Sequence, residues 1–565
     1  MKATCKAEKF GEITTLELPG ASELPANTNC LACSEDGRYL CVGHSQGLSV
    51  WCASSLIRVA EWLQEGLEIT FVQMTKMAEN TYLLGTVDDM GVARVFAHHS
   101  DGIHLLSVIN IMEDVNKRSI CLTLELLAGG HCGAVAISCN DAVWLEVYQF
   151  PTAAWLEEFE MVPSQKQDPN LAGDSSVKWS PVTLMMKVTP PKLPAGGVTE
   201  DPLGTVHRTD YLAHFLALDA VTGSSPQGRC TQHFLLPCGQ FPDESEAHLQ
   251  PAGMPVAVAV WWTGSHNLLQ YSLQKAPKNK PDVASMPDVL WPNAKEILCS
   301  AVSRCTRYVA LGLDDALVCV WDRRSGAPLS MVAVPAENST LLRMQFVDCG
   351  PMSAADCHFF TAEMVHLLVL CENGAMYTVA TGQGTQSCRV QLVERPKDPK
   401  DLTTITMSVP HLRGVSLVVQ RSGKMFLLDV INKATVCFLA PPTSYRVASP
   451  CNPVYALNTK QQALFIRGDW DSICSASSEE SRQSQLFVFH FGHSEIIKQY
   501  LVAHEDFPQQ QITQSHVNLD EMCNLYLQQR VLSADERNKA AAQTWEQLPE
   551  IAATLQQRQP GCRQL

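Results

Sequence analysis

Short runs of apolar residues alternate with turns rich in glycine and aspartate over most of this chain. The first complete set contains four such runs, at 30–33, 39–42, 48–51 and 58–62, and polar turns at 34–38 and 43–47 separate the first three. Short apolar runs bounded by such turns are typical of antiparallel β-strands. The pattern therefore predicts a four-stranded unit near the beginning of the chain.

Similar sets recur along the sequence. We assign them to 69–109, 119–159, 182–236, 256–273, 297–335, 341–380, 402–439 and 454–491. In the set at 119–159 we take residues 155–159 as the fourth strand. The set at 182–236 then begins with a strand at 182–188. Four-stranded repeats of roughly 40–45 residues are the signature of propeller blades. We therefore predict an all-β fold, a single propeller of seven or eight blades over residues 11–491, with one or two sets incomplete or shared. A strand at 13–18 can close the ring by pairing with the last blade.

Three stretches interrupt the repeats. They are a Pro- and Gly-rich loop at about 189–209, an irregular insert at 348–357 and a Ser-rich loop at 472–484. Beyond residue 491 the apolar period changes from two to about 3.6, which is the period of an α-helix. Residues 492–565 are therefore predicted to form a helical C-terminal tail.

The predicted tail carries two apolar faces. Leu519, Met522 and Tyr526 fall on one face of a first helix, and Trp545 and Leu548 belong to the apolar stripe of a second. The second helix is expected to start at a capping box that begins with a serine at position 533. Isolated helices of this length are marginally stable in water, so the stripe needs a surface to pack against. Two surfaces remain open, the propeller wall and another protein, and we take these five residues as candidate partner-binding residues.

The clearest repeat ends with the sequence Leu-Val-Cys-Val-Trp-Asp at 317–322, and residues 47–52, 91–96 and 424–429 are weaker copies. These motifs resemble the WD-repeat family, and the resemblance implies a β-propeller that acts as a non-enzymatic scaffold for other proteins. One family feature is missing, because Gly43-His44 and Gly130-His131 lie too close to the following Trp or Tyr. The hydrogen-bonded His–Asp network of regular blades is therefore not expected.

A narrower resemblance involves residues 87–96 and 116–122, together with the tail near Cys523 and 525–530. These stretches resemble a group of WD-repeat proteins of motile cilia and sperm tails. The resemblance implies a cytoskeletal component of the axoneme near the radial spokes, with other axonemal proteins as partners. Two alternatives stay open: a cytosolic adaptor, such as a ubiquitin-ligase substrate adaptor or a coat subunit, and an accessory protein of an electron-transport chain.

The net charge of the chain and the length of its apolar runs limit the classes of partner that we expect. Acidic residues outnumber basic ones by 58 to 42, which gives a net charge of −16, whereas a general nucleic-acid binder needs a basic surface. Residues 1–12 lack the apolar segment of a signal peptide, and apolar runs such as 254–262 are too short to span a bilayer. We therefore expect an intracellular protein with protein partners, without nucleic-acid or membrane partners.

The cysteine pattern does not indicate a metal site. Cys30 and Cys33 form one Cys-x-x-Cys, but no second pair with zinc-finger spacing follows. Residues three apart in a strand point to opposite faces, so these thiols are expected to be separate core groups. Looser groups, at 132 and 139 and at 349–358, match no metal module.

Two polar clusters are also interpreted without a catalytic role. His98 and His99 are expected in a solvated turn, and Glu157, Glu158 and Glu160 are expected at an exposed strand end. The sequence therefore predicts no catalytic residue, no cofactor, no metal and no small-molecule substrate.

Overall fold

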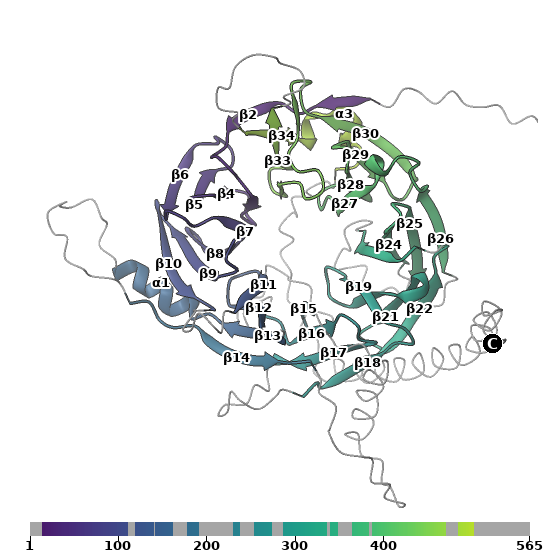
Figure 1. The fold of residues 1–565 in the computed structure, drawn as a ribbon, viewed down its shortest axis with the longest axis horizontal. Coiled ribbons are helices and arrows are strands. Elements are labelled where there is room, and N and C mark those ends of the chain that lie inside the picture. The colour runs from purple at the N-terminus through teal and green to yellow at the C-terminus, as the bar shows by residue number, and fades with distance from the viewer. Residues whose placement is uncertain are drawn as a thin grey trace, which may run out of the picture.

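The computed structural model of the 565-residue chain describes residues 14–110, 119–140, 142–161, 178–190, 230–237, 254–273, 286–335, 339–347, 364–382, 387–470 and 484–501. Within these ranges the strands gather into eight sheets around a central axis, one sheet per blade (Figure 1). The prediction of a single propeller of seven or eight blades is confirmed, with eight blades in this part of the chain. The three predicted interruptions lie almost entirely outside the described residues, and so does the tail after residue 501.

Blades 1 to 3 each contain four antiparallel strands, with the first strand nearest the axis and the fourth at the rim (Figure 1). Their strands are β3 (Cys30–Cys33), β4 (Tyr39–His44), β5 (Gly47–Cys52) and β6 (Arg58–Leu63); β7 (Ile69–Ala78), β8 (Thr81–Asp88), β9 (Ala93–His99) and β10 (Gly102–Val108); and β11 (Ile120–Leu126), β12 (Cys132–Cys139), β13 (Ala142–Gln149) and β14 (Thr183–Val188).

Blades 4 to 6 repeat the same order of strands. Their strands are β15 (Cys230–Leu235), β16 (Ala257–Trp262), β17 (Asn267–Ser272) and β18 (Val289–Pro292); β19 (Ile297–Val302), β20 (Tyr308–Leu313), β21 (Leu317–Asp322) and β22 (Ala327–Ala333); and β23 (Leu341–Phe346), β24 (Met364–Cys371), β25 (Met376–Gly382) and β26 (Cys388–Val393). The 3-10 turn η3 (Asp314–Ala316) joins β20 to β21, and η5 (Pro399–Asp401) follows β26.

Blades 7 and 8 hold both ends of the described chain. Blade 7 contains β27 (Thr403–Ser408), β28 (Val415–Gln420), β29 (Met425–Asp429) and β30 (Ala434–Ala440), and blade 8 contains β31 (Tyr445–Val447), β32 (Tyr455–Asn458), β33 (Ala463–Trp470) and β34 (Gln485–His490). β1 (Thr15–Glu17) adds to β30 in parallel, and β2 (Gly20–Glu23) pairs antiparallel with β34. The strand predicted at 13–18 therefore lies on blade 7, and the strand that completes the last blade is β2.

The strands follow from how each blade is packed. The two middle strands of a blade are covered on both faces by its neighbours, so β8 is buried at every position, whereas the rim strand β6 alternates between exposed and covered residues. Continuous apolar runs are expected for strands buried on both faces, and alternation for strands with one face in water. The buried core therefore runs around the ring between adjacent blades.

The third blade corrects the sequence-based assignment. Residues 155–159 belong to helix α1 (Thr152–Met161), and the fourth strand of the blade is β14, which we had placed in the next set. Trp155 and Phe159 are both buried and lie four residues apart, which is the helical spacing. The predicted fourth and fifth sets are therefore one blade, made of β15 to β18.

The two polar clusters also lie elsewhere than predicted. Glu158 is on helix α1, where its carboxylate accepts hydrogen bonds from the backbone N–H and the hydroxyl of Ser180. His98 is buried within β9, and His99 stacks on Phe159 with ring centroids 4.9 Å apart. The glutamates are therefore not at a strand end, and the histidines are not in a solvated turn. His99 is covered by α1, whereas the ring of His98 packs against Tyr39 and Tyr82.

The Trp-Asp repeat in blade 5 uses a different polar partner from the missing histidine. The indole N–H of Trp321 donates to Oδ1 of Asn293 at 3.4 Å, and Oδ1 of Asp322 accepts the backbone N–H of Arg324 at 3.0 Å. His44 and His131 bond elsewhere, near Gln46 and Thr152. In these contacts neither histidine of the two Gly-His pairs takes part in a Trp–Asp network.

A register shift recurs near the start of the first strand in five blades. Each shift leaves one unpaired residue between two paired ones, as in a β-bulge. These residues are Thr70, Leu122, Leu298, Leu342 and Thr404.

After β34 the chain forms η6 (Phe491–His493) and α3 (Glu495–Lys498) against blade 7. A bridge pairs Leu412 with Leu501, and the backbone N–H of Arg413 donates to the carbonyl of Tyr500 at 2.7 Å. The first residues after the last blade are thus fixed to the connection between β27 and β28. No helix among the described residues is long and apolar enough to cross a membrane.

Candidate partner-binding groove

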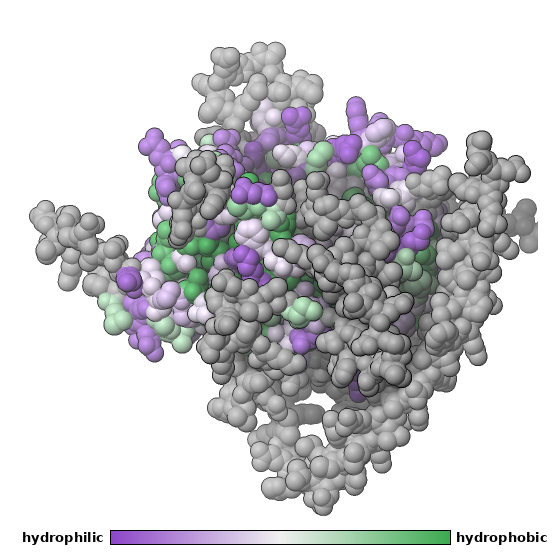
Figure 2. Space-filling view, turned by 60° about the horizontal axis from the view of Figure 1, so that its bottom comes forward, coloured by the Kyte–Doolittle hydropathy of each residue, from purple (hydrophilic) through white to green (hydrophobic). Residues whose placement is uncertain are grey.

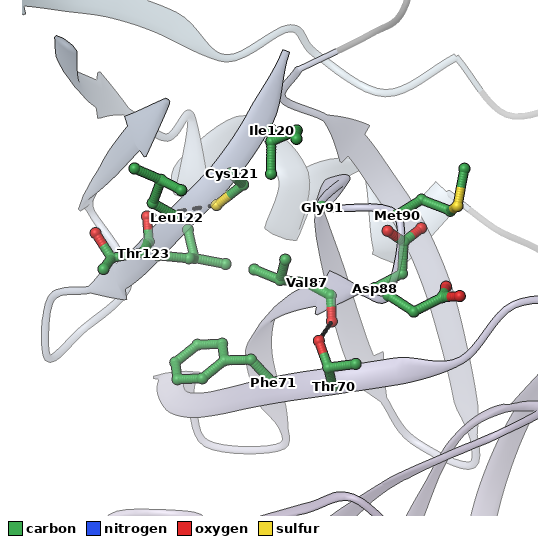
Figure 3. Close-up of a pocket in the computed structure, with 12 residues that line it drawn as sticks. Thr70, Phe71, Val87, Asp88, Met90, Gly91, Ile120, Cys121, Leu122 and Thr123 are labelled. Atoms are coloured by element: carbon green, nitrogen blue, oxygen red, sulfur yellow. Dashed lines mark hydrogen bonds between the residues drawn. The ribbon is translucent and has the colours of Figure 1, made fainter. Parts of the chain in front are cut away.

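A groove of about 420 Å³ opens between blades 2 and 3 (Figure 3). It is formed by the start of β7, the turn from β8 to β9 and the start of β11. The lining residues are Thr70, Phe71, Val87, Asp88, Asp89, Met90, Gly91, Ile120, Cys121, Leu122, Thr123 and Leu124. All of them belong to the part of the chain that the structure describes.

Large apolar side chains around this groove remain in contact with water. Phe71, Ile120 and Leu122 are each 40% exposed, and Met90 is 45% exposed. Apolar side chains also reach the surface at the left of Figure 2, the side on which blades 1 and 2 lie in Figure 1. A single exposed apolar residue is ordinary, but several around one concave site are typical of a binding surface.

The β8–β9 turn is held by the carboxylate of Asp88. Oδ1 accepts the backbone N–H of Val92 at 2.7 Å, and Oδ2 lies 2.5 Å from Nη1 of Arg94. Asp88 is only 4% exposed, so its charge is neutralised within the turn. This ion pair fixes the wall of the groove and leaves Asp88 with little charge to offer a ligand.

Asn110 ties this turn to the next blade. Its side-chain amide donates to the carbonyls of Gly91 at 2.8 Å and Ser119 at 3.1 Å, and its Oδ1 accepts the backbone N–H of Ala93 at 2.7 Å. The backbone N–H of Cys121 also donates to the carbonyl of Gly91, at 2.8 Å. The two walls of the groove are therefore joined by hydrogen bonds, and the site is built before any partner binds.

The carboxylate of Asp89 differs from that of Asp88. Asp89 is exposed, and its backbone N–H donates to the carbonyl of Glu68 at 2.9 Å. No hydrogen bond or ion pair joins the Asp89 carboxylate to another residue of the described ranges. Among the described residues, the Asp89 carboxylate is therefore a negative charge that is available at the rim of the groove.

Three titratable groups with shifted pKa values show how these shifts arise. Burial raises the pKa of Glu125 in blade 3 to about 7, despite a hydrogen bond from Gln232, and burial lowers the pKa of His233 in blade 4 to about 4. Hydrogen bonds from Ser54 and Ser55 lower the pKa of Cys52 in blade 1 to about 7. The partners of the acid and the histidine differ, because Glu125 bonds to Gln232 while Nε2 of His233 lies 2.7 Å from the hydroxyl of Ser300.

The structure keeps the candidate metal-binding residues apart. Cys30 and Cys33 are free thiols whose pKa burial raises to about 12, and the Sγ of Cys30 donates to the carbonyl of Ile69 at 3.8 Å. Cys132 is buried and Cys139 is partly buried, and no disulfide joins them. Within the described ranges, no group of three or more His, Cys, Asp or Glu side chains is arranged to hold a metal ion. The cluster at 349–358 lies outside those ranges.

The candidate tail residues, Leu519, Met522, Tyr526, Trp545 and Leu548, lie outside the described residues. The groove is not recognisable as a site in the sequence, because its residues come from three separate segments. One signal was present, since residues 87–96 and 116–122 carried the narrower resemblance, and eight residues of those stretches line the groove.

The eight-bladed ring and its Trp-Asp repeat define a WD-repeat β-propeller, a class of interaction scaffolds that is typically non-enzymatic. The sequence profile of the family described as WD repeat-containing protein 93 matches residues 28–225 and 219–318. Together these matches cover 28–318, which is 291 of 565 residues. The chain belongs to the WD repeat-containing protein 93 family, and the matched residues include 87–96 and 116–122, two of the stretches that carried the narrower resemblance.

Several solved structures are similar to this chain at low sequence identity. The C-terminal WD40 domain of Sif2 is 9% identical, with 85% of this chain and 99% of that chain covered and a TM-score of 0.45. Sqt1 of Saccharomyces cerevisiae is 11% identical, with 84% and 98% covered and a TM-score of 0.42. Raptor of Chaetomium thermophilum is 10% identical with a TM-score of 0.36; the match covers 83% of this chain and 28% of the Raptor chain.

Proposed function

We propose that this chain is a non-enzymatic scaffold of the motile cilium or sperm flagellum, built into the axoneme near the radial spokes. The groove between blades 2 and 3 carries the scaffold part of the proposal, because four large apolar side chains around it are 40–45% exposed. Its hydrogen-bonded walls are already in place, so a partner gains apolar contact without ordering a loop first. The resemblance to ciliary members of the family supports the location.

The groove is tested by the chain's own partners in ciliated cells. The variant Phe71→Ser/Leu122→Ser removes two exposed apolar groups, and Leu342→Ser is a matched control because Leu342 is 53% exposed at the equivalent bulge of blade 6. We expect the double variant to fold normally by circular dichroism and to lose axonemal proteins that wild type and Leu342→Ser recover. Equal recovery by all three proteins would rule out the groove as the partner site.

The location is tested separately with a tagged chain. We expect a signal along motile cilia or the sperm tail. A diffuse cytosolic signal would favour the adaptor alternative, and co-fractionation with mitochondria would favour the electron-transport alternative. Either result would contradict the axonemal proposal.

We also propose that the C-terminal tail binds a partner through Trp545 and Leu548. Deletion of residues 533–565 should leave the unfolding temperature of the propeller within a few degrees of wild type, because the tail then packs on the partner instead of the propeller. The same deletion should remove at least one co-purified axonemal protein. A deletion that unfolds the propeller, or that leaves every partner bound, contradicts this role.

A further inference from the structure

We propose that the groove between blades 2 and 3 binds a partner segment in which a lysine or arginine stands next to large apolar residues. This inference rests on the proposed scaffold function and specifies the chemistry of the partner. It combines two features of the site: apolar side chains around the groove and one available carboxylate at its rim.

The size of the groove limits what enters it. Its volume of about 420 Å³ lies near the lower end of ligand pockets, which span roughly 300–1,000 Å³. A site of this size accepts a few side chains, and it does not accept a whole helix. Phe71 and Leu122 come from the first strands of adjacent blades and face the same space (Figure 3). A short apolar stretch of a partner therefore fits between them.

The polar groups that line the groove are mostly occupied. The hydroxyl of Thr70 donates to the carbonyl of Val87 at 3.1 Å, the Sγ of Cys121 donates to the carbonyl of Thr123 at 3.4 Å, and the hydroxyl of Thr123 accepts from Gln232 at 3.4 Å. These groups offer little to a polar ligand, because their hydrogen bonds are already made.

The carboxylate of Asp89 favours a partner segment with a positive charge. The carboxylate of Asp88 is neutralised by Arg94, whereas the exposed carboxylate of Asp89 has no partner among the described residues. A cation beside the apolar stretch of the partner meets that carboxylate at the rim. The net charge of −16 further attracts a cationic segment at long range and repels an acidic one.

The proposal is tested with fluorescein-labelled decapeptides and the full chain. The probe is Gly-Ser-Gly-Leu-Arg-Phe-Ile-Gly-Ser-Gly, and two matched peptides replace the Arg with Glu or the three apolar residues with Ser. Fluorescence anisotropy gives the dissociation constants. The variants are Asp89→Asn, Asp89→Lys and Phe71→Ser/Leu122→Ser. Leu342→Ser and Glu79→Gln serve as controls, because Glu79 is an exposed acid at the other end of β7.

Wild type should bind the Arg peptide most tightly. Asp89→Asn should weaken that binding by roughly two- to fivefold, which is the range of an exposed ion pair, and Asp89→Lys should reverse the preference so that the Glu peptide binds better. Loss of two apolar contacts in Phe71→Ser/Leu122→Ser should weaken binding by about tenfold or more. The two control variants should bind like wild type, and 500 mM NaCl should remove most of the preference for Arg.

The outcomes separate this inference from the proposed function. Equal binding of the Arg and Glu peptides by wild type, or a preference that Asp89→Lys does not reverse, overturns the partner chemistry. If Phe71→Ser/Leu122→Ser still loses its axonemal partners in cells, the groove keeps its scaffold role and only the chemistry fails. If that variant keeps every partner, both the scaffold role of the groove and the inference fail.

Discussion

Gly91 lies in the turn from β8 to β9 with a φ of +75°, a region that disfavours residues with a side chain. A Cβ at this position would lie 2.5 Å from Cγ2 of Ile120 across the groove. The backbone of Gly91 also joins the two walls, because its carbonyl accepts from Asn110 and from Cys121. The position therefore needs glycine both for its conformation and for its close approach to blade 3.

Replacing Gly91 with alanine should lower the free energy of unfolding by about 2–3 kcal/mol, because the positive φ and the clash with Ile120 both cost stability. The control is Gly66→Ala, where φ is +74° and no atom lies within 4 Å of the added Cβ. That control should lose only about 1 kcal/mol. Urea denaturation of the two variants measures the difference, and equal losses would show that the contact with Ile120 is unimportant.

At the residue scale, the sequence predicted groups whose environment depends on a single strand. Cys30 and Cys33 were expected to be separate core thiols, and both are partly buried and pack against different core clusters. The roles of Asn110 and Asp89 could not be predicted, because they depend on contacts between blades. The sequence around a short polar residue in a turn is the same whether the side chain bonds to water or to the next blade.

At the scale of elements, the connection between β27 and β28 supports the first residues after the last blade. His411 in this connection is 6% exposed, packs against Phe491 with ring centroids 4.9 Å apart, and neither ring nitrogen has a hydrogen-bond partner among the described residues. Burial lowers the pKa of His411 to about 4. The folded chain therefore disfavours the protonated imidazole at this site.

This burial makes the propeller sensitive to mild acid. Between pH 6.5 and pH 4 the unfolded chain protonates His411 and the folded chain does not, so stability falls as the pH falls. From pH 7.5 to pH 5 the loss from this residue is about 2 kcal/mol. His411→Phe should reduce the measured loss by that amount, while His233 contributes equally to both proteins. Phe491→Leu should lower stability by the same amount at both pH values, and an unchanged pH dependence in His411→Phe would contradict the assignment.

Most strands could be predicted because apolar runs and turns alternate locally. The errors arose where a short element lacks that pattern or where an insertion separates it from its blade. β2 has the sequence Gly-Ala-Ser-Glu, which has no apolar alternation, and β18 has only four residues. Helix α1 stands between β13 and β14, so its apolar residues were taken for the rim strand that follows later in the chain.

At the scale of the whole molecule, the ring is closed by strands from the beginning of the described chain. β2 forms the rim strand of blade 8, while β1 is a short, mostly exposed strand on blade 7. Leu18 and Leu24 flank β2 and are buried, at 0% and 5% exposure. The closure therefore depends more on residues 18–24 than on β1.

Two deletions separate these contributions. Removing residues 1–17 should cost about 1 kcal/mol or less, because the short, mostly exposed β1 is the only strand of the described chain that it removes. Removing residues 1–24 should cost about 4 kcal/mol or more, because two buried leucines and the rim strand of blade 8 are lost. Chemical denaturation measures both. Equal stability of the two truncated chains would show that β2 does not hold the ring closed.

The same closure decides when this protein can finish folding during its synthesis. Glu23 pairs with Gln485, so the strand that completes blade 8 waits for its partner while roughly 460 residues are made. At about 5–20 residues per second this interval is roughly 25–90 s. Throughout that time the early blades stand as an open arc with uncovered apolar faces at both ends. Nascent chains stalled before residue 485 should therefore recruit chaperones that the released protein no longer binds.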